Sequence, residues 1–328
     1  MSFVQVRPDL DGSGGGALIC TARDTMRHRF LTADVFTDRI FGGNQLAVFP
    51  DGRGLTTTQM QSTAREFNFS ETVFVLPPES PAHARRLRIF TPGAELPFAG
   101  HPTIGTAFVL GSIGDLRLEE EWTRIVLEEG VGPVAVRIRA EGRRPVFAQL
   151  TAPRPPEFGP PAPARADLAD MLSLDTGDLL DDPNGPQGVS CGLPYLFIPL
   201  ISRDAVRRAR LRLDVWDKVL ARYWSPHPYI FAFDPEIPGH DLRARMFGPA
   251  VGVAEDPATG SAATALGGYL GIRDARRGGT LRYVVEQGFE MGRPSLLEIE
   301  VEKNAGTIAE IRVGGSSVLV SEGTIEIP

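Results

Sequence analysis

Lysine is nearly absent from this chain of 328 residues, because only Lys218 and Lys303 occur among 34 cationic side chains. An enzyme that forms a Schiff base, including any pyridoxal-phosphate enzyme, has to use one of these two lysines. Lys218 lies in the amphipathic segment 211–224, and Lys303 lies in a polar turn between two expected strands. We therefore expect both to be solvated surface residues, which argues against Schiff-base chemistry.

Cysteine, long apolar runs and an excess of basic charge are missing as well. The two cysteines, Cys20 and Cys191, provide neither a disulfide framework nor a cysteine-built zinc site, and the five histidines show no metal-ligand spacing. No apolar run approaches the roughly 18 residues of a membrane helix. The net charge of −7 argues against a nucleic-acid partner. We expect a cytoplasmic protein that uses no metal ion and no other cofactor.

The chain does contain the composition of a folded protein and enough residues for about two domains. Hydrophobic residues make up 42% and charged residues 23% of the sequence, as in ordinary globular proteins. Residues 1–25 include a glycine-rich run and no helical or strand periodicity, so we expect a disordered extension there. Met26 directly precedes a segment typical of a strand, and we expect it to be the natural start.

Short segments typical of β-strands alternate with a few helical ones from Arg29 onward. The expected strands are 29–36, 45–50, 72–76, 86–90, 189–200, 229–233 and 242–247. The expected helices are 56–67, capped by Thr56 and ended by Asn68, then about 102–110 and 261–270. The proline-rich segment 151–164 predicts an extended surface connection near a domain boundary.

An internal repeat indicates how the chain is organised. Residues 88–111 and 245–271 both begin with Arg-x-Phe-x-Pro and continue through an acidic turn and a glycine into a helix of small residues. Gly100 in the first copy corresponds to Gly260 in the second, about half of the chain later. The sequence therefore predicts two related halves.

Each copy of the repeat places its glycine at the start of a helix, followed by His101 in the first copy and Ser261 in the second. The first turn of a helix has unpaired N–H groups and the positive end of the helix dipole, so it binds anions. Taken alone, either helix start is typical of an ordinary helix N-cap that follows a strand and binds no ligand. Two of them facing each other across a cleft would hold a carboxylate from both sides.

Three titratable side chains near these helix starts are candidates for acid–base catalysis. Glu71 is surrounded by apolar residues, which raise the pKa of a carboxyl group towards neutrality, unless it is a strand-edge residue that faces water. Asp256 is either a second acid–base group or a charge at a helix N-terminus, and His101 can donate a hydrogen bond or a proton. We expect Glu95 and Glu255, at matching repeat positions, to be structural and to bond backbone amides of the glycine loops.

Four motifs occur in order along the chain: FTDRIFGGNQLAVF (36–49), NFSETVF (68–74), RIFTPGAELPFAGHPTIGTA (88–107) and VAEDPATGSAATALGGYL (253–270). Together they resemble the PhzF-like family of phenazine-biosynthesis isomerases and epimerases. The resemblance implies an α+β fold of the diaminopimelate-epimerase type, in which two pseudo-symmetric halves are each a mixed β-barrel around a central helix. We expect residues 26–144, together with a strand at 317–328, to form one half, and residues 145–316 to form the other.

The resemblance also implies where the active site lies and what its residues do. Glu71 moves the proton, with His101 and Asp256 as further catalytic residues. It also implies that His101, Asp256 and Ser261 contact the substrate. We expect the substrate-binding residues to be Asn44, Ser70, Gly100, Thr259, Gly260 and Ser261. The family's usual Gly-Asn-Pro reads Gly-Asn-Gln at residues 43–45 in this chain.

Related racemases of this fold use a cysteine in each half, and the matching positions in this chain are Ala99 and Thr259. Racemisation by two thiols is therefore excluded. The sequence predicts a cofactor-independent isomerase that moves a proton on a small carboxylated substrate, amino-acid-like or cyclohexadiene. An epimerase with Glu71 and Asp256 as its two bases remains an alternative, and so does a binding protein without chemistry. The family implies a homodimer.

Overall fold

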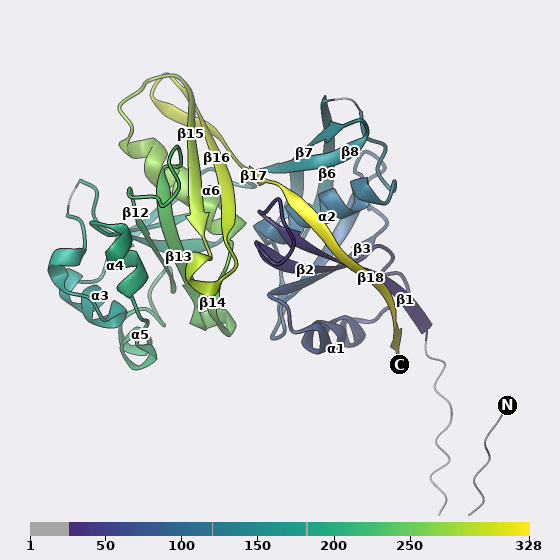
Figure 1. The fold of residues 1–328 in the computed structure, drawn as a ribbon, viewed down its shortest axis with the longest axis horizontal. Coiled ribbons are helices and arrows are strands. Elements are labelled where there is room, and N and C mark those ends of the chain that lie inside the picture. Colours follow the sequence, from purple (N-terminus) through teal and green to yellow (C-terminus); the bar gives the residue numbers. More distant parts are fainter. Residues whose placement is uncertain (1–25, 120, 182) are drawn as a thin grey trace, which may run out of the picture.

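The chain folds into two lobes that lie side by side, each built around one long helix (Figure 1). The structure, a computed structural model, describes residues 26–119, 121–181 and 183–328. The extension expected at residues 1–25 lies outside the described residues. Within the described ranges, no helix is long and apolar enough to cross a membrane.

The first lobe holds two helices, a series of strands from the first part of the chain, and the last strand. Its elements are β1 (Met26–Val35), β2 (Asn44–Phe49), α1 (Thr57–Phe67), β3 (Glu71–Leu76), β4 (Arg85–Phe90), β5 (Glu95–Leu96), α2 (Gly100–Ser112), β6 (Glu121–Glu129), β7 (Gly132–Glu141), β8 (Arg144–Thr151) and β18 (Ser317–Ile327).

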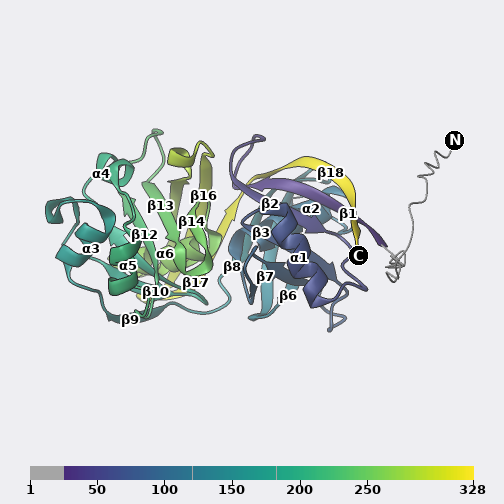
Figure 2. The same cartoon turned by 90° about the horizontal axis from the view of Figure 1, so that it is seen from below.

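The second lobe carries more helices, and Figure 2 shows α3, α4 and α5 on its outer side, away from the first lobe. Its elements are β9 (Glu157–Pro161), α3 (Arg165–Leu172), η1 (Thr176–Asp178), β10 (Gln187–Ser190), β11 (Pro194–Pro199), α4 (Arg203–Arg208), α5 (Leu213–Val219), β12 (His227–Ala232), β13 (Leu242–Gly248), η2 (Pro249–Val251), β14 (Val253–Asp256), α6 (Gly260–Arg273), β15 (Gly279–Gln287), η3 (Phe289–Met291), β16 (Ser295–Asn304) and β17 (Thr307–Gly315).

The two lobes repeat one pattern of strand pairing. Strands β2 and β3 are parallel, as are β11 and β12. Strand β3 pairs antiparallel with β4, as β12 does with β13. Strand β4 also pairs in parallel with β6, and β13 pairs in the same way with β15. This correspondence confirms the predicted α+β fold of two pseudo-symmetric halves.

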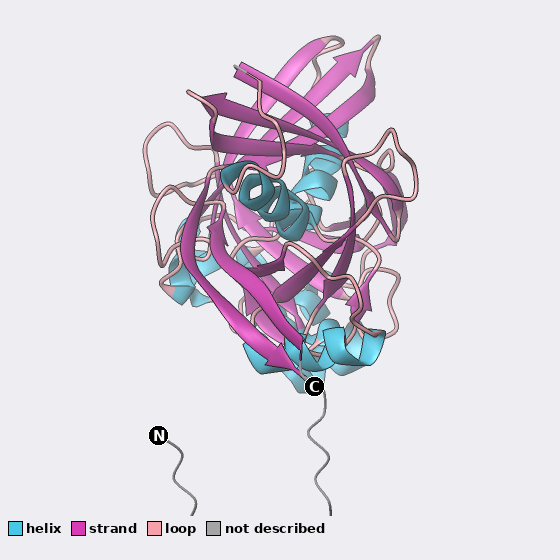
Figure 3. Cartoon of the chain, turned by 90° about the vertical axis from the view of Figure 1, so that its right-hand side faces the viewer, coloured by secondary structure: helices cyan, strands magenta, loops and turns pink. Residues whose placement is uncertain are grey.

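The central helices α2 and α6 are enclosed by strands, and Figure 3, which faces the first lobe, shows a helix at the centre of its strands. All residues of 100–111 and of 260–271 are buried. Small residues make this enclosure possible. A Cβ atom on Gly105 would lie 2.5 Å from a methyl carbon of Val35, and one on Gly267 would lie 2.7 Å from an isoleucine methyl carbon. The strands can therefore pack directly against the helix backbones.

The last strand returns to the first lobe, where Figure 1 shows it beside β1. Strand β18 pairs antiparallel with β1, from Met26 opposite Ile327 to Val35 opposite Ser317. Strand β17 of the second lobe pairs with β8 of the first. The sheet thus continues from one lobe to the other, and the division of the chain into domains at residue 144 stays a prediction.

The local predictions for α1 are confirmed, and the predicted strand 189–200 needs correction. Thr56 caps α1 reciprocally with Gln59, and Asn68 ends the helix in the left-handed conformation at φ 52°. The segment 189–200 is not one strand but parts of β10 and β11, separated by a turn at residues 191–193. The proline-rich segment 151–164 has no buried residue, and its residues 157–161 form the extended strand β9, which pairs with β10.

Lys218 is exposed as predicted, whereas the prediction of a solvated Lys303 is wrong. Lys303 lies in β16 and is 5% exposed. Its Nζ atom donates to the backbone carbonyls of Gly271 at 2.9 Å and of Asp274 at 2.7 Å. A cation at the end of α6 compensates for the unpaired carbonyl groups and the negative end of the dipole there. Both lysines nevertheless lie away from the cavity described below.

Candidate active site

The N-termini of the two central helices meet between the lobes. A Cβ atom on Gly100 would lie 2.5 Å from the carbonyl carbon of Gly260 and 2.5 Å from the backbone nitrogen of Ser261. This close approach therefore requires the glycine. Both helices direct their unpaired N–H groups and positive dipole ends towards the same junction.

Glu71 and His101 are titratable side chains that the first lobe contributes to this junction. Glu71 is the first residue of β3, and His101 lies in the first turn of α2. Oε2 of Glu71 and Nε2 of His101 are 3.3 Å apart, and the side chains are 14% and 4% exposed. Neither atom has a hydrogen-bond partner among the described residues. Glu71 is therefore not a strand-edge residue that faces water, and both atoms can bond to a bound molecule.

Asp256 comes from the second lobe, at the end of β14, and receives hydrogen bonds from both lobes. Thr259 Oγ1 donates to its Oδ2 at 2.5 Å. Asn44 Nδ2 and Ser70 Oγ, both from the first lobe, donate to its Oδ1 at 2.8 and 3.4 Å. Asn44 Nδ2 also lies 3.2 Å from Nδ1 of His101. The amide of Asn44 thus connects the two lobes beneath the reactive side chains.

The surroundings shift the pKa values of all three groups. Burial, and then the nearby charge of Asp256, raise the pKa of Glu71 well above its ordinary value of 4.5. Burial raises the pKa of Asp256 to about 6, against the effect of its donors Thr259, Asn44 and Ser70. Burial lowers the pKa of His101 to about 3, so its imidazole is neutral near pH 7. The two carboxyl groups repel each other when both are ionised, so they titrate as a pair in which Glu71 holds its proton more tightly.

Polar residues from two strands hold the start of α6, and no motif of the sequence marks them. Gln287, at the end of β15, donates through Nε2 to the carbonyl of Asp256 at 2.8 Å and to Thr259 Oγ1 at 3.0 Å. The hydroxyl groups of Tyr195 and Ser261 lie 2.7 Å apart. Burial raises the pKa of Tyr195, so its hydroxyl group keeps its proton. A polar residue within the otherwise apolar strand β11 is the one local signal that singles out Tyr195, and β15 offers no such signal for Gln287.

A cavity of about 60 Å³ lies among these groups. Eight of the nine predicted site residues line it: Ser70, Glu71, Gly100, His101, Asp256, Thr259, Gly260 and Ser261. The ninth, Asn44, lies behind them and bonds to Asp256. Tyr195 and His227 also line the cavity, although sequence reasoning did not predict either of them. The structure therefore brings the predicted residues of both halves together at one place.

We expected Glu95 and Glu255 to be structural and to accept hydrogen bonds from backbone amides. They are structural, but their partners among the described residues are arginine side chains. Glu95 accepts hydrogen bonds from Arg88 at 2.6 and 2.7 Å. Glu255 accepts two from Arg245, at 2.7 and 2.8 Å. The arginine that opens each copy of the repeat thus pairs with the acidic residue of the following turn. A bidentate pair of this kind holds the strand and the turn that precede each central helix.

No group of three or more His, Cys, Asp or Glu side chains among the described residues is arranged to hold a metal ion. Cys191 is buried, and its thiol donates to the backbone carbonyl of Thr264 at 3.6 Å. Burial raises the pKa of this thiol to about 12. It is therefore a poor nucleophile and a poor base near neutral pH.

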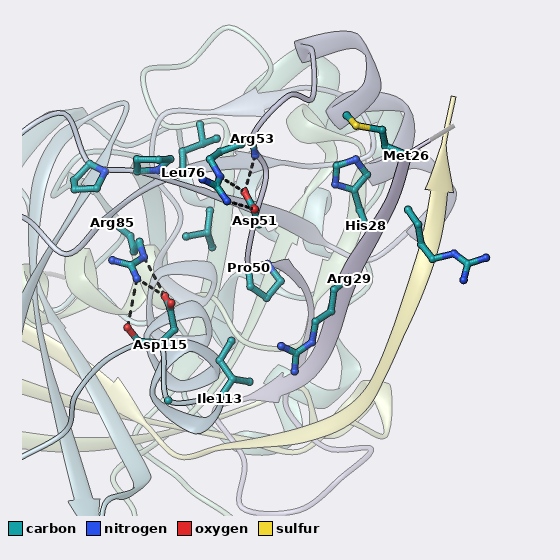
Figure 4. A pocket seen from close by; sticks show the side chains of 15 residues that line it. Met26, His28, Arg29, Pro50, Asp51, Arg53, Leu76, Arg85, Ile113 and Asp115 are labelled. Atoms are coloured by element: carbon teal, nitrogen blue, oxygen red, sulfur yellow. Dashed lines mark hydrogen bonds and ion pairs between the residues drawn. The ribbon is translucent and has the colours of Figure 1, made fainter. Parts of the chain in front are cut away.

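A second, wider cavity of about 920 Å³ lies at the outer side of the first lobe and is lined by other residues (Figure 4). Its arginines are largely paired with acidic side chains, since Arg53 bonds to Asp51 and Arg85 bonds to Asp115. None of the predicted site residues lines it. We therefore place the candidate active site at the junction of the central helices.

Comparisons with known proteins agree with this fold. A family model described as phenazine biosynthesis-like protein matches residues 33–323. A trans-2,3-dihydro-3-hydroxyanthranilate isomerase of Pseudomonas fluorescens is 37% identical over 91% of this chain and 99% of its own length. An uncharacterized isomerase of Mesorhizobium japonicum is 39% identical over 91% of this chain and 98% of its own length.

Solved structures with the same fold include members of this family and epimerases. A PhzF-family phenazine biosynthesis protein of Bacillus anthracis superposes with a TM-score of 0.80 at 26% identity, covering 92% of this chain and 99% of its own. A predicted epimerase of Pseudomonas aeruginosa reaches 0.72 at 32% identity, covering 91% and 99%. A hydroxyproline epimerase of Agrobacterium vitis reaches 0.63 at 13% identity, covering 92% and 91%, which shows a shared fold alone.

Proposed function

The chain belongs to the phenazine biosynthesis-like PhzC-PhzF family and is an isomerase, and on this premise we propose the reaction that it catalyses. The protein moves a proton on a small carboxylated substrate by general acid–base catalysis, without a cofactor. In its ionised form, Glu71 takes the proton from a carbon atom next to an activating group, and the protonated carboxyl group then returns it elsewhere. His101 and Asp256 assist by hydrogen bonding or proton relay.

The observation that carries this proposal is the pair of Glu71 Oε2 and His101 Nε2 in the wall of the cavity, which lie 3.3 Å apart and have no hydrogen-bond partner among the described residues. Burial and the charge of Asp256 raise the pKa of Glu71. A carboxyl group with a pKa nearer to neutrality can both accept and donate a proton, as an isomerisation requires. The neutral imidazole of His101, which lies beside Glu71, can form a hydrogen bond with the substrate.

The helix starts at Gly100 and Gly260 suit the carboxylate of the substrate. Unpaired N–H groups and two positive dipole ends point to the same junction, and the surrounding residues exclude most water. A carboxylate held there would place the adjacent carbon atoms near Glu71. Ser70, Thr259 and Ser261 add hydroxyl groups to this binding site, and Asn44 holds Asp256 in place.

We propose an amino-acid-like or cyclohexadiene carboxylate as the substrate class. Relatives from three Pseudomonas species are named for their action on trans-2,3-dihydro-3-hydroxyanthranilate, and they are 35–37% identical to this chain. That compound is both an amino acid and a cyclohexadiene. It is therefore the first substrate to test.

Purified protein should convert trans-2,3-dihydro-3-hydroxyanthranilate, and the variant Glu71→Gln should lose at least about 100-fold in kcat/KM, because it loses its acid–base group. A matched control is Glu79→Gln, since the side chain of Glu79 is 74% exposed and lies outside the cavity. The control should retain wild-type activity. Full turnover by Glu71→Gln would show that another residue is the base.

An epimerase that uses Glu71 and Asp256 as two bases is the second candidate function. Both carboxyl groups are buried, have raised pKa values and come from opposite lobes. Chiral chromatography of recovered amino and hydroxy acids separates the two reactions, because an epimerase inverts a stereocentre and leaves the connectivity unchanged. A protein that binds these ligands without isomerising or epimerising any of them would instead be a binding protein.

We also propose that the protein is a cytoplasmic homodimer whose two domains are residues 26–144 with 317–328, and residues 145–316. The pairing of β18 with β1 supports the assignment of the last strand to the first domain. Light scattering on the full chain measures the oligomeric state directly. A monomer at micromolar concentration would rule out the dimer.

A further inference from the structure

His227 is a polar side chain of the cavity that takes no part in the hydrogen-bond network described above. It is the first residue of β12, it is 7% exposed, and it lines the cavity. Its Nδ1 atom is buried and has no hydrogen-bond partner among the described residues. A buried nitrogen without a partner is costly, because it has lost its bonds to water. Because His227 lines the cavity, its unpaired nitrogen is a candidate to bond a ligand there.

The neighbours of His227 do not supply the missing partner. Tyr195 is paired with it in the parallel ladder of β11 and β12, and the two ring centroids are 5.7 Å apart. The hydroxyl group of Tyr195 is already bonded to Ser261 at 2.7 Å. Apolar side chains, including Leu193 and Met246, line the same cavity. His227 therefore offers a hydrogen-bonding group among largely apolar residues of the second lobe, whereas Glu71 comes from the first.

We propose that His227 determines substrate specificity by hydrogen-bonding an uncharged polar substituent of the substrate, namely a hydroxyl group. This inference rests on the proposed function, in which the helix starts hold the carboxylate. Burial lowers the pKa of His227 to about 4, so its ring is neutral and has one donor and one acceptor. A hydroxyl group matches either nitrogen. A substrate that lacks it would leave Nδ1 buried and unpaired, which is a strong source of discrimination.

Calorimetric titration with two stable aromatic ligands tests this assignment. 3-Hydroxyanthranilate and anthranilate share a carboxylate and an amino group and differ by one hydroxyl group. The wild type should bind 3-hydroxyanthranilate about tenfold more tightly, as one net hydrogen bond provides. His227→Phe should bind both ligands equally while keeping the wild-type affinity for anthranilate.

Two further variants separate this effect from a general loss of structure. His28→Phe is the matched control, because His28 is a 9% exposed histidine whose Nε2 has no hydrogen-bond partner among the described residues, but it lines the other cavity. It should keep the tenfold preference. His227→Asn keeps a hydrogen-bonding group in the cavity and should keep part of the preference.

A preference that survives intact in His227→Phe would overturn the assignment and leave the proposed function standing. Equal affinities of the wild type for the two ligands would do the same. If the wild type binds neither ligand and does not convert trans-2,3-dihydro-3-hydroxyanthranilate, the proposed function fails, and the role of His227 fails with it.

Discussion

Asp256 and Glu71 face the same junction from opposite lobes, and their surroundings differ. Asp256 accepts three hydrogen bonds, from Thr259, Asn44 and Ser70. Oε2 of Glu71 has no hydrogen-bond partner among the described residues. The ionised form is therefore better stabilised at Asp256, and a single proton shared by the pair belongs mainly to Glu71.

Replacing Asp256 by asparagine should lower the pKa of Glu71, because it removes the neighbouring negative charge and leaves burial as the main cause of the shift. Carbon-13 NMR titration of glutamate-labelled protein measures this value without requiring activity. Ser70→Ala keeps the charge of Asp256 and should not lower the pKa of Glu71. An identical titration of Glu71 in Asp256→Asn and wild type would contradict the electrostatic link between the two groups.

Among the secondary-structure elements, β6 ends at Glu129, which occupies the position that Gln287 has at the end of β15. Thr103 Oγ1 lies 2.7 Å from the backbone carbonyl of Ala99 and 2.6 Å from Glu129 Oε1. The hydroxyl group has one hydrogen, and the carbonyl group can only accept it. The hydroxyl group can donate to only one of these oxygens at a time, and a protonated Glu129 supplies the hydrogen for the second bond, in keeping with burial that raises its pKa to about 8.

Glu129→Gln should make the protein more stable at alkaline pH. Because the pKa of Glu129 is about 8 in the fold against an ordinary value of 4.5, its contribution to stability is complete below pH 4.5 and is lost as the pH rises through 8. The amide of glutamine keeps a donor for Thr103 and has no proton to lose. Urea unfolding should show a gain on the order of 2 kcal/mol at pH 8.5 and almost none at pH 4.5. A difference that does not change with pH would contradict a protonated Glu129.

The elements differ in how far the sequence alone could predict them. The caps of α1 and the helix starts of α2 and α6 were predictable, because Thr56, Asn68 and the repeated glycines act on their own neighbours. The burial of Lys303 was not predictable, because its partners are carbonyls at the end of α6, brought to it by the pairing of β15 with β16. Gln287 was missed for the same reason, since Asp256 and Thr259 become its partners only after folding.

At the scale of the whole molecule, the account depends on the contact between the two lobes at Gly100 and Gly260. Sites for small molecules usually have volumes of about 300–1,000 Å³, whereas this cavity measures about 60 Å³. This cavity is therefore smaller than sites of that kind usually are. The repeat predicted that the two helix starts belong together, but the distance between them depends on the packing of both lobes.

Gly100→Ala should reduce kcat/KM by about 100-fold, because a displacement of roughly 1 Å between reacting groups has an effect of this size. Its Cβ atom would lie 2.5 Å from the backbone of Gly260 and Ser261, which cannot rotate away as a side chain can. Gly177→Ala is the matched control, since its Cβ atom would meet nothing within 4 Å. Steady-state kinetics of both variants, with thermal unfolding as a check of folding, measure the effect. Wild-type activity in Gly100→Ala would show that the close approach of the lobes is not needed.

The central claim is that Glu71 carries a proton between carbon atoms of the substrate. The most direct measurement is proton NMR of trans-2,3-dihydro-3-hydroxyanthranilate incubated with the protein in D₂O. A carboxyl group exposed to solvent during turnover exchanges its proton, so the wild type should incorporate deuterium at carbon in the product, and Glu71→Gln should incorporate none. Deuterium incorporation by Glu71→Gln at the wild-type rate would contradict the claim.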